Sequence, residues 1–372
     1  MDHCDSGGCF YLQENMKKKM KQKPRNQDKY SDGSDLELGP SKSLDINRTS
    51  SALKMVLEMR DTAFGGRELG KAHEVLYEMF NDSDCFVTGT FSGAMTVAKM
   101  GLMISEMIDR GMLNAVVTTG AVLVHGIIET IGLSHFKCNP RNNDSENFYK
   151  GYNRIYDTIE LENNLDQVEE IVKTVLNQWD CSKSLSGKTF CEEMGRYLVK
   201  NSKGRGILKS AFHKNIPVYV PVLTDSELGL DINLFRKTQM LNGETPLVFN
   251  VFDDVDDYAD RIINSKTMGI FTIGGGVPRN WAQQVAPYLD IMNRKLDKKI
   301  TPKRFKYAVR ICPEPVQWGG LSGCTYSECV SWGKMVPEEQ GGMWAEVMAD
   351  ATIAWPLLLR SVIERLGLEK KS

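Results

Sequence analysis

CFVTGT at residues 85–90 and AVVTTGA at residues 115–121 are the two short apolar runs that decide the fold of this chain. Branched apolar residues in such runs are typical of strands that are buried on both faces of a sheet. Small residues follow or end these runs, at 92–94 and at 120–121, and an amphipathic helix through Met107 is expected between them. A strand, a helix and a second strand joined in this way predict a βαβ unit with parallel strands.

The alternation of strands and helices continues along the chain from residue 51 onward. Apolar runs and helical periodicity predict strands at 216–225, 247–251, 268–273 and 307–311, and helices at 53–59, 68–80, 253–264 and 343–366. Pro356 is expected to kink the last helix, and the polar insert 139–153 is expected on the surface. We therefore predict an α/β fold, with a doubly wound, mainly parallel Rossmann-like sheet and helices on both faces. No linker interrupts residues 51–372, so we expect a single domain.

Residues 1–50 differ from the rest of the chain in composition. They carry three lysines at 17–19 and further basic residues at Lys21, Lys23 and Arg25, but few branched apolar residues. Such a segment cannot bury enough apolar surface to offset its chain entropy. We predict a disordered basic and polar tail. A localisation signal or a partner contact is the alternative to a solvated charge run.

Composition and charge argue against several classes of function. The 372 residues are 41% hydrophobic with a formal net charge of −2, so no global charge favours nucleic acid or a membrane surface. No apolar run reaches the roughly 20 residues of a membrane span, and the N-terminus lacks the pattern of a secretory signal. Nine cysteines without a Cys-x-x-Cys pair disfavour structural zinc and a disulfide framework. We expect no metal, no nucleic acid, no membrane partner and a cytoplasmic location.

The sequence ECVSWGKM at residues 328–335 singles out one lysine, Lys334. A nucleophilic lysine must lose its proton, and a free pKa of about 10.4 leaves roughly one amine in a thousand neutral at pH 7. A site must therefore dehydrate the amine or surround it with positive charge. The ring of Trp332 and the apolar residues before it are suited to dehydrate Lys334, and Gly333 permits close approach of a backbone or ligand. An ordinary surface lysine is the alternative.

Glycine-rich turns follow several predicted strands. The turns at 120–121 and 274–276 come after apolar strands, as backbone that approaches a phosphate must. Neither turn is a dinucleotide or P-loop signature, so a plain tight turn remains the alternative to a nucleotide-binding crevice. The candidate residues at these strand ends are Ser92, Gly93, Thr119, Gly120, Ala121 and Gly275.

Carboxylates also gather after the predicted strands and toward the C-terminus, at Asp225, Glu227, Asp231, Glu328 and Asp350. A polyamine is a fitting partner, because its protonated amines need opposing carboxylates. Opposite charges 4 Å apart attract by about 4 kcal/mol at an effective dielectric constant of 20, before desolvation is subtracted. These acids are therefore candidate substrate ligands, and the alternative is that each caps a helix or is solvated.

Five motifs in collinear order across residues 50–366 resemble the deoxyhypusine synthase family. They are TTGA at 118–121, LTDSELG at 223–229, GGGVP at 274–278, WGGLSG at 318–323 and ExVSWGK at 328–334. The last two motifs are highly specific. WGGLSG and GVPRN at 276–280 resemble the archaeal and bacterial branch of the family.

The resemblance implies an enzyme that uses NAD to oxidise spermidine. An enzyme lysine attacks the resulting imine, diaminopropane leaves, and the aminobutyl group is passed to an acceptor amine, on a lysine of the hypusine-bearing translation factor. Lys334 matches the family's nucleophile, Trp332 the aromatic of the polyamine channel, and Glu328 a carboxylate that binds substrate amines. Gly319 and Gly320 fall in the polyamine-binding loop.

The resemblance also implies where the cofactor binds and how the chain assembles. The positions that hold NAD in the family match Thr119, Gly120, Asp225, Gly275, Asp350 and Ala351. His125 stands where this branch carries a histidine, which would orient substrate or move protons, and a structural histidine is the alternative. Family members are homotetramers with sites at subunit interfaces, and their N-terminal segment covers the channel.

Two positions depart from the branch. After the second strand the branch carries an amide and a carboxylate where this chain has Val122 and Gly126. Three readings therefore stay open. The first is deoxyhypusine synthase, the second is a homospermidine synthase that uses a free diamine such as putrescine, and the third is a non-catalytic regulatory paralogue. Retention of Lys334, Trp332 and Glu328 argues against the third reading, while Val122 and Gly126 argue for it.

Overall fold

The computed structural model describes residues 24–34, 39–139, 141 and 143–369. Residues 42–372 form one compact unit, and residues 1–41 form a separate unit. The basic run at 17–23 lies outside the described residues, as do residues 35–38, so the disordered tail stays a prediction. The described part of that segment forms two short 3-10 helices, η2 (Gln27–Lys29) and η4 (Ile46–Arg48).

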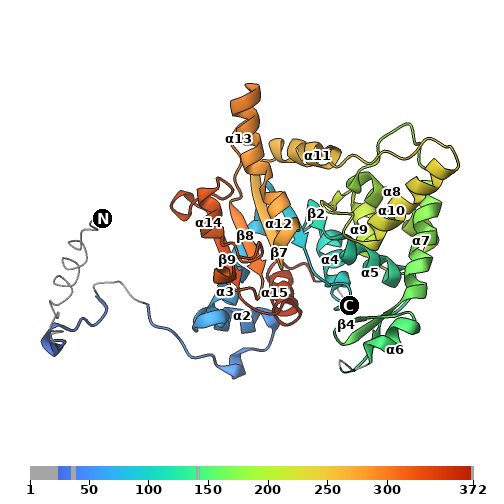
Figure 1. The fold of residues 1–372 in the computed structure, drawn as a ribbon. Helices are drawn as coiled ribbons and strands as arrows, with labels where there is room; N and C mark the ends of the chain where they lie inside the picture. The colour runs from blue at the N-terminus through green and yellow to red at the C-terminus, as the bar shows by residue number, and fades with distance from the viewer. Residues whose placement is uncertain (1–23, 35–38, 140, 142, 370–372) are drawn as a thin grey trace, which may run out of the picture. The chain divides into compact units, whose positions relative to one another are not determined.

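Six parallel strands form the central sheet of residues 42–372, in the order β6-β2-β1-β7-β8-β9 (Figure 1). Because β1 pairs with both β2 and β7, the chain builds the sheet outward from β1 in two directions. The predicted doubly wound parallel sheet is therefore confirmed. Its strands are β1 (Cys85–Phe91), β2 (Ala115–Thr118), β6 (Val218–Tyr219), β7 (Thr267–Ile273), β8 (Tyr307–Ile311) and β9 (Met343–Val347).

Successive side chains of a strand point to opposite faces, and here they enter two hydrophobic cores. Val116 belongs to one core and its neighbours Ala115 and Val117 to the other. Helices contributing to the first core are α2 (Ala52–Arg60), α3 (Phe64–Asn81), α4 (Gly101–Asp109), α5 (Gly120–Thr130), α7 (Glu162–Leu176), α8 (Gly187–Asn201), α9 (Ile207–Lys214), α10 (Glu227–Leu241) and α15 (Ala351–Arg365). Helices contributing to the second are α11 (Phe252–Ile263), α12 (Gly276–Gln283), α13 (Val285–Leu296) and α14 (Tyr326–Ser331). Helices on both faces are thus confirmed.

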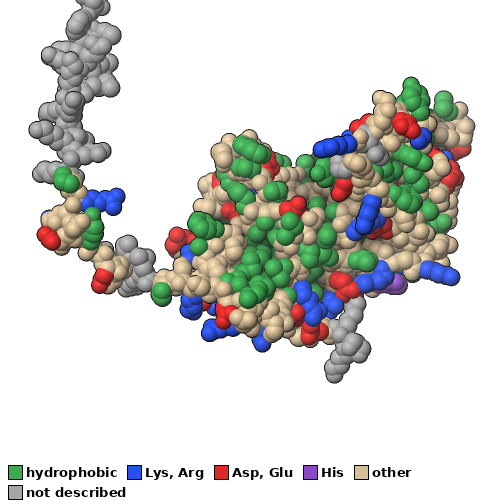
Figure 2. All heavy atoms as spheres, turned by 90° about the horizontal axis from the view of Figure 1, so that it is seen from below, with side chains coloured by type: hydrophobic (Ala, Val, Ile, Leu, Met, Phe, Trp, Pro, Cys, Tyr) green, Lys and Arg blue, Asp and Glu red, His purple; other side chains and the backbone are tan. Residues whose placement is uncertain are grey.

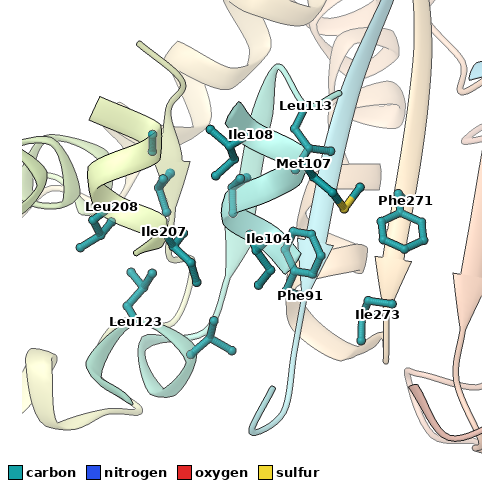
Figure 3. Close-up of a cluster of buried hydrophobic side chains, with 14 of the residues drawn as sticks. Phe91, Ile104, Met107, Ile108, Leu113, Leu123, Ile207, Leu208, Phe271 and Ile273 are labelled. Atoms are coloured by element: carbon teal, nitrogen blue, oxygen red, sulfur yellow. The ribbon is translucent and has the colours of Figure 1, made fainter. Parts of the chain in front are cut away.

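The first core holds β1 and β7 against α4 (Figure 3). The rings of Phe91 and Phe271 meet edge to face with centroids 6.2 Å apart, and Phe91 stacks on Trp355 at 5.7 Å. Ile104 and Met107 of α4 are fully buried in the same cluster. Burying one side chain of this size contributes about 1.5–3 kcal/mol to the stability of the fold. This contact therefore fixes the ends of β1 and β7, from which the following turns start.

The polar insert and the residues on either side of it form a small antiparallel sheet, in the order β3-β5-β4. Its elements are β3 (Phe136–Lys137), α6 (Asp144–Tyr149), β4 (Tyr152–Ile155) and β5 (Thr158–Leu161). Phe148 and Tyr149 are largely exposed, which agrees with the predicted surface location. β5 leads directly into α7 and so ties the insert to the main body.

Three predicted elements are wrong. The strand at 216–225 is only two residues long, because it is an edge strand and Pro221 lacks the N–H that a longer ladder needs. The strand at 247–251 is a single bridge between Phe249 and Leu185. The helix at 343–366 is a strand and a helix: Met343–Val347 pairs with β8, and Asp350 then caps α15, which continues through Pro356.

Candidate active site

Five strands of the central sheet end together, which places the segments after them along one edge. Phe91 pairs with Thr118 and with Ile273, Ile273 with Ile311, and Ile311 with Val347. The strand order changes direction at β1, and open α/β sheets bind ligands outside the carboxyl ends of the strands at such a point. Most of the candidate cofactor residues therefore belong to this carboxyl edge.

Ser92 joins the ends of β1 and β7 at the carboxyl edge. Its Oγ donates to the carbonyl of Ile273 (3.2 Å) and accepts from the N–H of Gly275 (3.0 Å). Gly274 has a φ of +77°, and a Cβ there would lie 2.3 Å from Ser92 Oγ. A Cβ on Gly275 would lie 2.7 Å from the Cα of Ser322. The positive φ of Gly274 and the close approach of the Ser322 backbone to Gly275 require glycine at both positions.

Helix N-termini gather beyond the same strand ends. Thr119 caps α5 by accepting from the N–H of Val122, and a Cβ on Gly120 would lie 2.0 Å from Ser226 Oγ. Asp350 caps α15 by accepting from the N–H of Thr352 at 2.6 Å. α12 begins after Gly275 without a side-chain cap. An uncapped helix N-terminus beside a glycine turn is suited to bind an anionic group.

The candidate acids differ in environment. Asp225 and Asp350 are exposed, and Asp225 precedes the first residues of α10. Asp231 lies on α10 and is half-buried; burial, with the nearby charges of Glu169 and Glu227, raises the pKa of its carboxyl to about 6. A carboxyl with this pKa gains its full negative charge most readily when a cation binds beside it.

Lys334 is buried, with 6% of its surface exposed. Its Nζ donates to Asn280 Oδ1 of α12 at 3.0 Å. Burial lowers the pKa of the Lys334 amine, and the charge of Arg279 acts in the same direction. The Cys329 thiol, also buried, has its pKa raised to about 12 and stays neutral beside it. The sequence-based expectation of a dehydrated amine thus agrees with the structure.

The residues before Lys334 lie on and just after α14. Thr325 caps α14 by accepting from the N–H of Glu328 (3.0 Å), and Glu328 is exposed. Trp332 is 64% exposed, and the centroid of its ring lies 5.9 Å from Lys334 Nζ. The expected shielding by Trp332 is therefore partial: the ring borders the amine and leaves most of its own surface open to a ligand or a partner.

Two buried arginines fix the loop that carries Gly319 and Gly320. Arg279 donates to the carbonyls of Leu321 (2.8 Å) and Cys324 (2.7 Å). Arg310 also donates to the Cys324 carbonyl (2.8 Å) and pairs with Glu346 at 2.7 Å. η5 (Val316–Trp318) leads into this loop. Sequence reasoning missed both arginines, although an arginine within the apolar strand 307–311 was a signal that a buried partner exists.

His125 lies on α5 with its ring nearly buried. Its Nδ1 lies 3.3 Å from Glu160 Oε2, and His135 Nε2 lies 2.6 Å from the same oxygen. Burial opposes ionisation of Glu160, but hydrogen bonds from His125, His135 and Asn164 outweigh it and lower its pKa to about 2. Within the described residues, His125 has no hydrogen bond to any other predicted site residue.

Val122 and Gly126 lie on the packed side of α5. Val122 is fully buried in the first core. A Cβ on Gly126 would lie 3.4 Å from Thr96 Cγ2 and 3.8 Å from Ile207. The departures from the branch pattern therefore fall where α5 packs against its neighbours.

α12 connects the carboxyl edge with Lys334. The backbone of Lys334 lies at the opposite end of the sheet, because its neighbour Met335 bridges to Phe305, just before β8. α12 starts at the glycine turn, and Asn280, just over one turn along it, holds the Lys334 amine. The structure thus brings Lys334 beside the helix that begins at Gly276. Asp231 and His125 make no direct contact with Lys334 among the described residues.

The fold and the site define a doubly wound α/β protein with a glycine-lined ligand edge and a buried lysine. The sequence model of the deoxyhypusine synthase family matches residues 54–362. A relative from Archaeoglobus fulgidus named "Probable deoxyhypusine synthase 2" is 32% identical over 306 residues, covering 82% of this chain and 96% of the relative. This chain therefore belongs to the deoxyhypusine synthase family, a family of transferases.

A further relative and a solved structure are also similar to this chain. A protein from Elusimicrobium minutum named "Deoxyhypusine synthase-like protein" is 29% identical and covers 85% of this chain and 82% of the relative. A crystal structure from Entamoeba histolytica that carries the name deoxyhypusine synthase superposes with a TM-score of 0.55 at 15% identity, over 86% of this chain and 96% of that chain. The latter likeness concerns the fold alone. Among the helices of the described residues, none combines the length and hydropathy that a bilayer crossing requires.

Proposed function

We propose that this chain is a deoxyhypusine synthase, which transfers the aminobutyl group of spermidine to a lysine of the hypusine-bearing translation factor in an NAD-dependent reaction. The observation that carries the proposal is the amine of Lys334: it is buried, its pKa is lowered by burial, and Asn280 fixes its position. An amine in this state is suited to covalent catalysis through an imine.

Lys334 supplies the nucleophile. Because burial lowers its pKa, more of the amine is neutral at physiological pH than for an exposed lysine. The neutral Nζ attacks the carbon of the C=N bond of oxidised spermidine, the bond from that carbon to the diaminopropane nitrogen breaks, and diaminopropane leaves with a proton. The aminobutyl group remains as an imine on Lys334. The acceptor amine then attacks the same carbon and releases Lys334.

The carboxyl edge fits NAD. The start of α12 is uncapped and directly follows the glycine turn at 274–276, which suits the approach of a pyrophosphate. When bound, NAD would accept a hydride from spermidine and return it to the final imine. The residues that would hold it are Ser92, Gly93, Thr119, Gly120, Ala121, Asp225, Gly275, Asp350 and Ala351.

Glu328 and Trp332 beside Lys334, together with Asp231 on α10, fit a polyamine. Glu328 lies six residues before Lys334 and is exposed, and the face of Trp332 attracts cations. Asp231 gains charge when a cation approaches, because its pKa is raised to about 6. We assign spermidine binding to Glu328, Trp332, Asp231 and the loop of Gly319 and Gly320, with His125 as a further substrate ligand through its Nε2.

The apolar surface around this region supports assembly into a homotetramer. Trp318, Trp332, Met348 and Ile353 are all more than half exposed, and all lie near the motifs assigned to the ligands. Figure 2 shows hydrophobic side chains gathered over the middle of one face. Apolar clusters of this kind mark interaction sites, so a second copy of this chain would cover part of the surface. The seven cysteines within the described residues are unpaired, which suits a cytoplasmic enzyme.

An acceptor assay tests the proposal. Purified protein is incubated with NAD, spermidine and one acceptor at a time: the hypusine-bearing translation factor, or putrescine. We expect diaminopropane release together with labelled aminobutyl transfer to the factor. Transfer to putrescine alone would replace the proposal with a homospermidine synthase. If no diaminopropane is released with either acceptor, the result contradicts the proposed chemistry and favours a regulatory paralogue.

A further inference from the structure

Three side chains converge in the packed region between α5, β5 and α7, and only His125 among them has a part in the proposed function, as a substrate ligand through its Nε2. They are His125 of α5, His135 of the segment before β3, and Glu160 of β5, and all three are buried. The pairs of facing atoms are 3.1 Å apart for His135 Nε2 and His125 Nδ1, 2.6 Å for His135 Nε2 and Glu160 Oε2, and 3.3 Å for His125 Nδ1 and Glu160 Oε2.

Hydrogen bonds cannot satisfy all three contacts of this triangle. A carboxylate oxygen offers only lone pairs, and each imidazole nitrogen offers either a proton or a lone pair. If both nitrogens carry protons, both N–H groups donate to Glu160 Oε2, and their hydrogens crowd each other because the two nitrogens are only 3.1 Å apart. If only one does, the lone pair of the other nitrogen faces the lone pairs of Glu160. A cation in the centre would accept a lone pair from each of the three atoms.

The dimensions of the triangle match a small metal ion. Zinc binds histidine nitrogen at about 2.0–2.1 Å and carboxylate oxygen at about 2.0–2.2 Å in tetrahedral geometry, which separates neighbouring ligand atoms by about 3.3 Å. The observed separations of 3.1 and 3.3 Å lie close to this value, and the third, 2.6 Å between His135 Nε2 and Glu160 Oε2, would have to widen on metal binding. Imidazole and carboxylate together favour zinc and similar divalent ions over the hard ions magnesium and calcium.

The surroundings orient the ligands as outer groups of a metal site do. Glu160 Oε1 accepts from Asn164 Nδ2 at 2.6 Å and from the N–H of Leu161 at 2.9 Å, which leaves Oε2 to face the histidines. The carboxylate of Glu129 lies 3.8 Å from His135 Nδ1. Carboxylates commonly accept from the second nitrogen of a metal-bound histidine and fix its tautomer.

Lys99 is the competing group. Its Nζ lies 3.0 Å from His135 Nδ1 and also pairs with Glu129. A metal on Nε2 requires a proton on Nδ1, so Lys99 must withdraw and Glu129 must accept from His135. The Lys99 side chain is 51% exposed, which leaves it free to move into solvent.

We propose that His125, His135 and Glu160 form a binding site for one zinc ion or a similar divalent transition-metal ion, with the fourth position taken by water. The site ties α5, whose first residue lies at the carboxyl edge, to the small sheet and α7. The ligands are separated by nine and 24 intervening residues, and none is a cysteine, so the expectation of no metal drawn from cysteine spacing could not detect this site. The proposal does not depend on the reaction at Lys334.

Cobalt titration of the full chain tests the site. The protein is prepared without a histidine tag, stripped with a chelator and titrated with Co²⁺, whose visible absorption reports tetrahedral nitrogen and oxygen ligation. We expect about one Co²⁺ per chain, displaced by Zn²⁺, and an affinity at least about 100-fold lower in His135→Gln. His213→Gln is the matched control, because His213 is exposed on α9, and should bind as the wild type does.

A second variant keeps the test decisive if His135→Gln does not fold. Lys99→Met leaves all three ligands intact and removes the competing ammonium group, so it should bind Co²⁺ more tightly, by about 10-fold. If the two histidines only form hydrogen bonds, neither the wild type nor Lys99→Met will show a saturable Co²⁺ absorption. That result, or equal affinity in the wild type and His135→Gln, would overturn the proposal.

Discussion

One buried amine and its immediate neighbours set the chemistry at the scale of single residues. Lys334 combines loss of solvent with a neutral hydrogen-bond acceptor, since Asn280 offers an amide oxygen where a carboxylate would stabilise the charged form. The sequence predicted Lys334 from its position after Trp332 and Gly333. It could not predict Asn280 as the partner, because the contact joins residues 54 positions apart.

Replacing Lys334 by arginine separates chemistry from cofactor binding. We expect Lys334→Arg to abolish aminobutyl transfer, by at least about 1,000-fold, because arginine cannot deprotonate. NAD binding should stay within a few-fold of the wild type. Lys266→Arg, at an exposed lysine, is the control and should retain activity. An equal loss of NAD affinity in Lys334→Arg would assign the side chain a structural role.

Asn280→Asp tests how the amine is kept neutral. The new carboxylate would stand about 3 Å from Nζ and raise the pKa of Lys334, because an opposite charge favours the protonated amine. Because the reaction needs the neutral amine, its rate rises with pH up to that pKa, and the rise should move to higher pH in the variant. Single-turnover diaminopropane release measured across pH checks this, with Asn280→Ala as the uncharged control. An unmoved profile would contradict the role of Asn280.

At the scale of elements, the predicted β1–α4–β2 unit and the strands at 268–273 and 307–311 are confirmed, since long apolar runs leave little choice of structure. The wrong predictions concern segments whose structure depends on their place in the sheet. The strand at 216–225 is cut short at an edge by Pro221, and the residues of β9 carry an apolar pattern that fits a strand or a helix until Asp350 caps α15. Pairing with β8 decides between them, and that pairing is not visible in the local sequence.

The loop before α14 depends on an ion pair from the sheet. Arg310, almost fully buried, pairs with Glu346 and donates to loop carbonyls. We expect Arg310→Met to destabilise the protein by about 3 kcal/mol, because it leaves a partly buried carboxylate without its partner. Urea unfolding measures this, and Glu346→Gln added to Arg310→Met should recover part of the loss. A change of less than about 0.5 kcal/mol would show that the ion pair does not hold the loop.

His73 makes the contact between α3 and α15 sensitive to pH. The hydroxyl of Ser361 donates its proton to the Leu358 carbonyl, so Nδ1 of His73 donates to Ser361 Oγ, at 2.8 Å. The other ring nitrogen, Nε2, is buried without a hydrogen-bond partner among the described residues. Burial, with the charge of Arg365, lowers the pKa of His73 to about 4. Between about pH 6.5 and pH 4, His73 is therefore mostly protonated in the unfolded chain and mostly neutral in the folded protein.

The free energy of unfolding should accordingly fall as pH decreases from about 6.5 to 4, by about 3 kcal/mol from His73 alone. Urea unfolding at several pH values measures the slope, and His73→Gln should remove this part of it. His213→Gln, at an exposed histidine, is the control and should leave the slope unchanged. The same slope in His73→Gln as in the wild type would contradict the assignment.

At the scale of the whole molecule, the site is a product of the sheet order. Parallel strands in register bring Ser92, Gly275 and the cap of α5 to one edge, and α12 carries the connection from that edge to Lys334. The sequence predicted which residues belong to strand ends, because each end carries its own small residues. It could not predict that Arg279 and Arg310 hold the loop before α14, because every residue has a backbone carbonyl and the sequence does not show which of them accept. Residues 42–372 therefore owe the arrangement of the site to topology more than to any single motif.

Trapping the covalent intermediate tests the central claim most directly. The protein is incubated with NAD and labelled spermidine, reduced with borohydride and mapped by peptide mass spectrometry. The account predicts one stable aminobutyl adduct, on the peptide that contains Lys334, which disappears when NAD is omitted or in Lys334→Arg. An adduct on a different lysine, or none in the presence of bound NAD and spermidine, would contradict it.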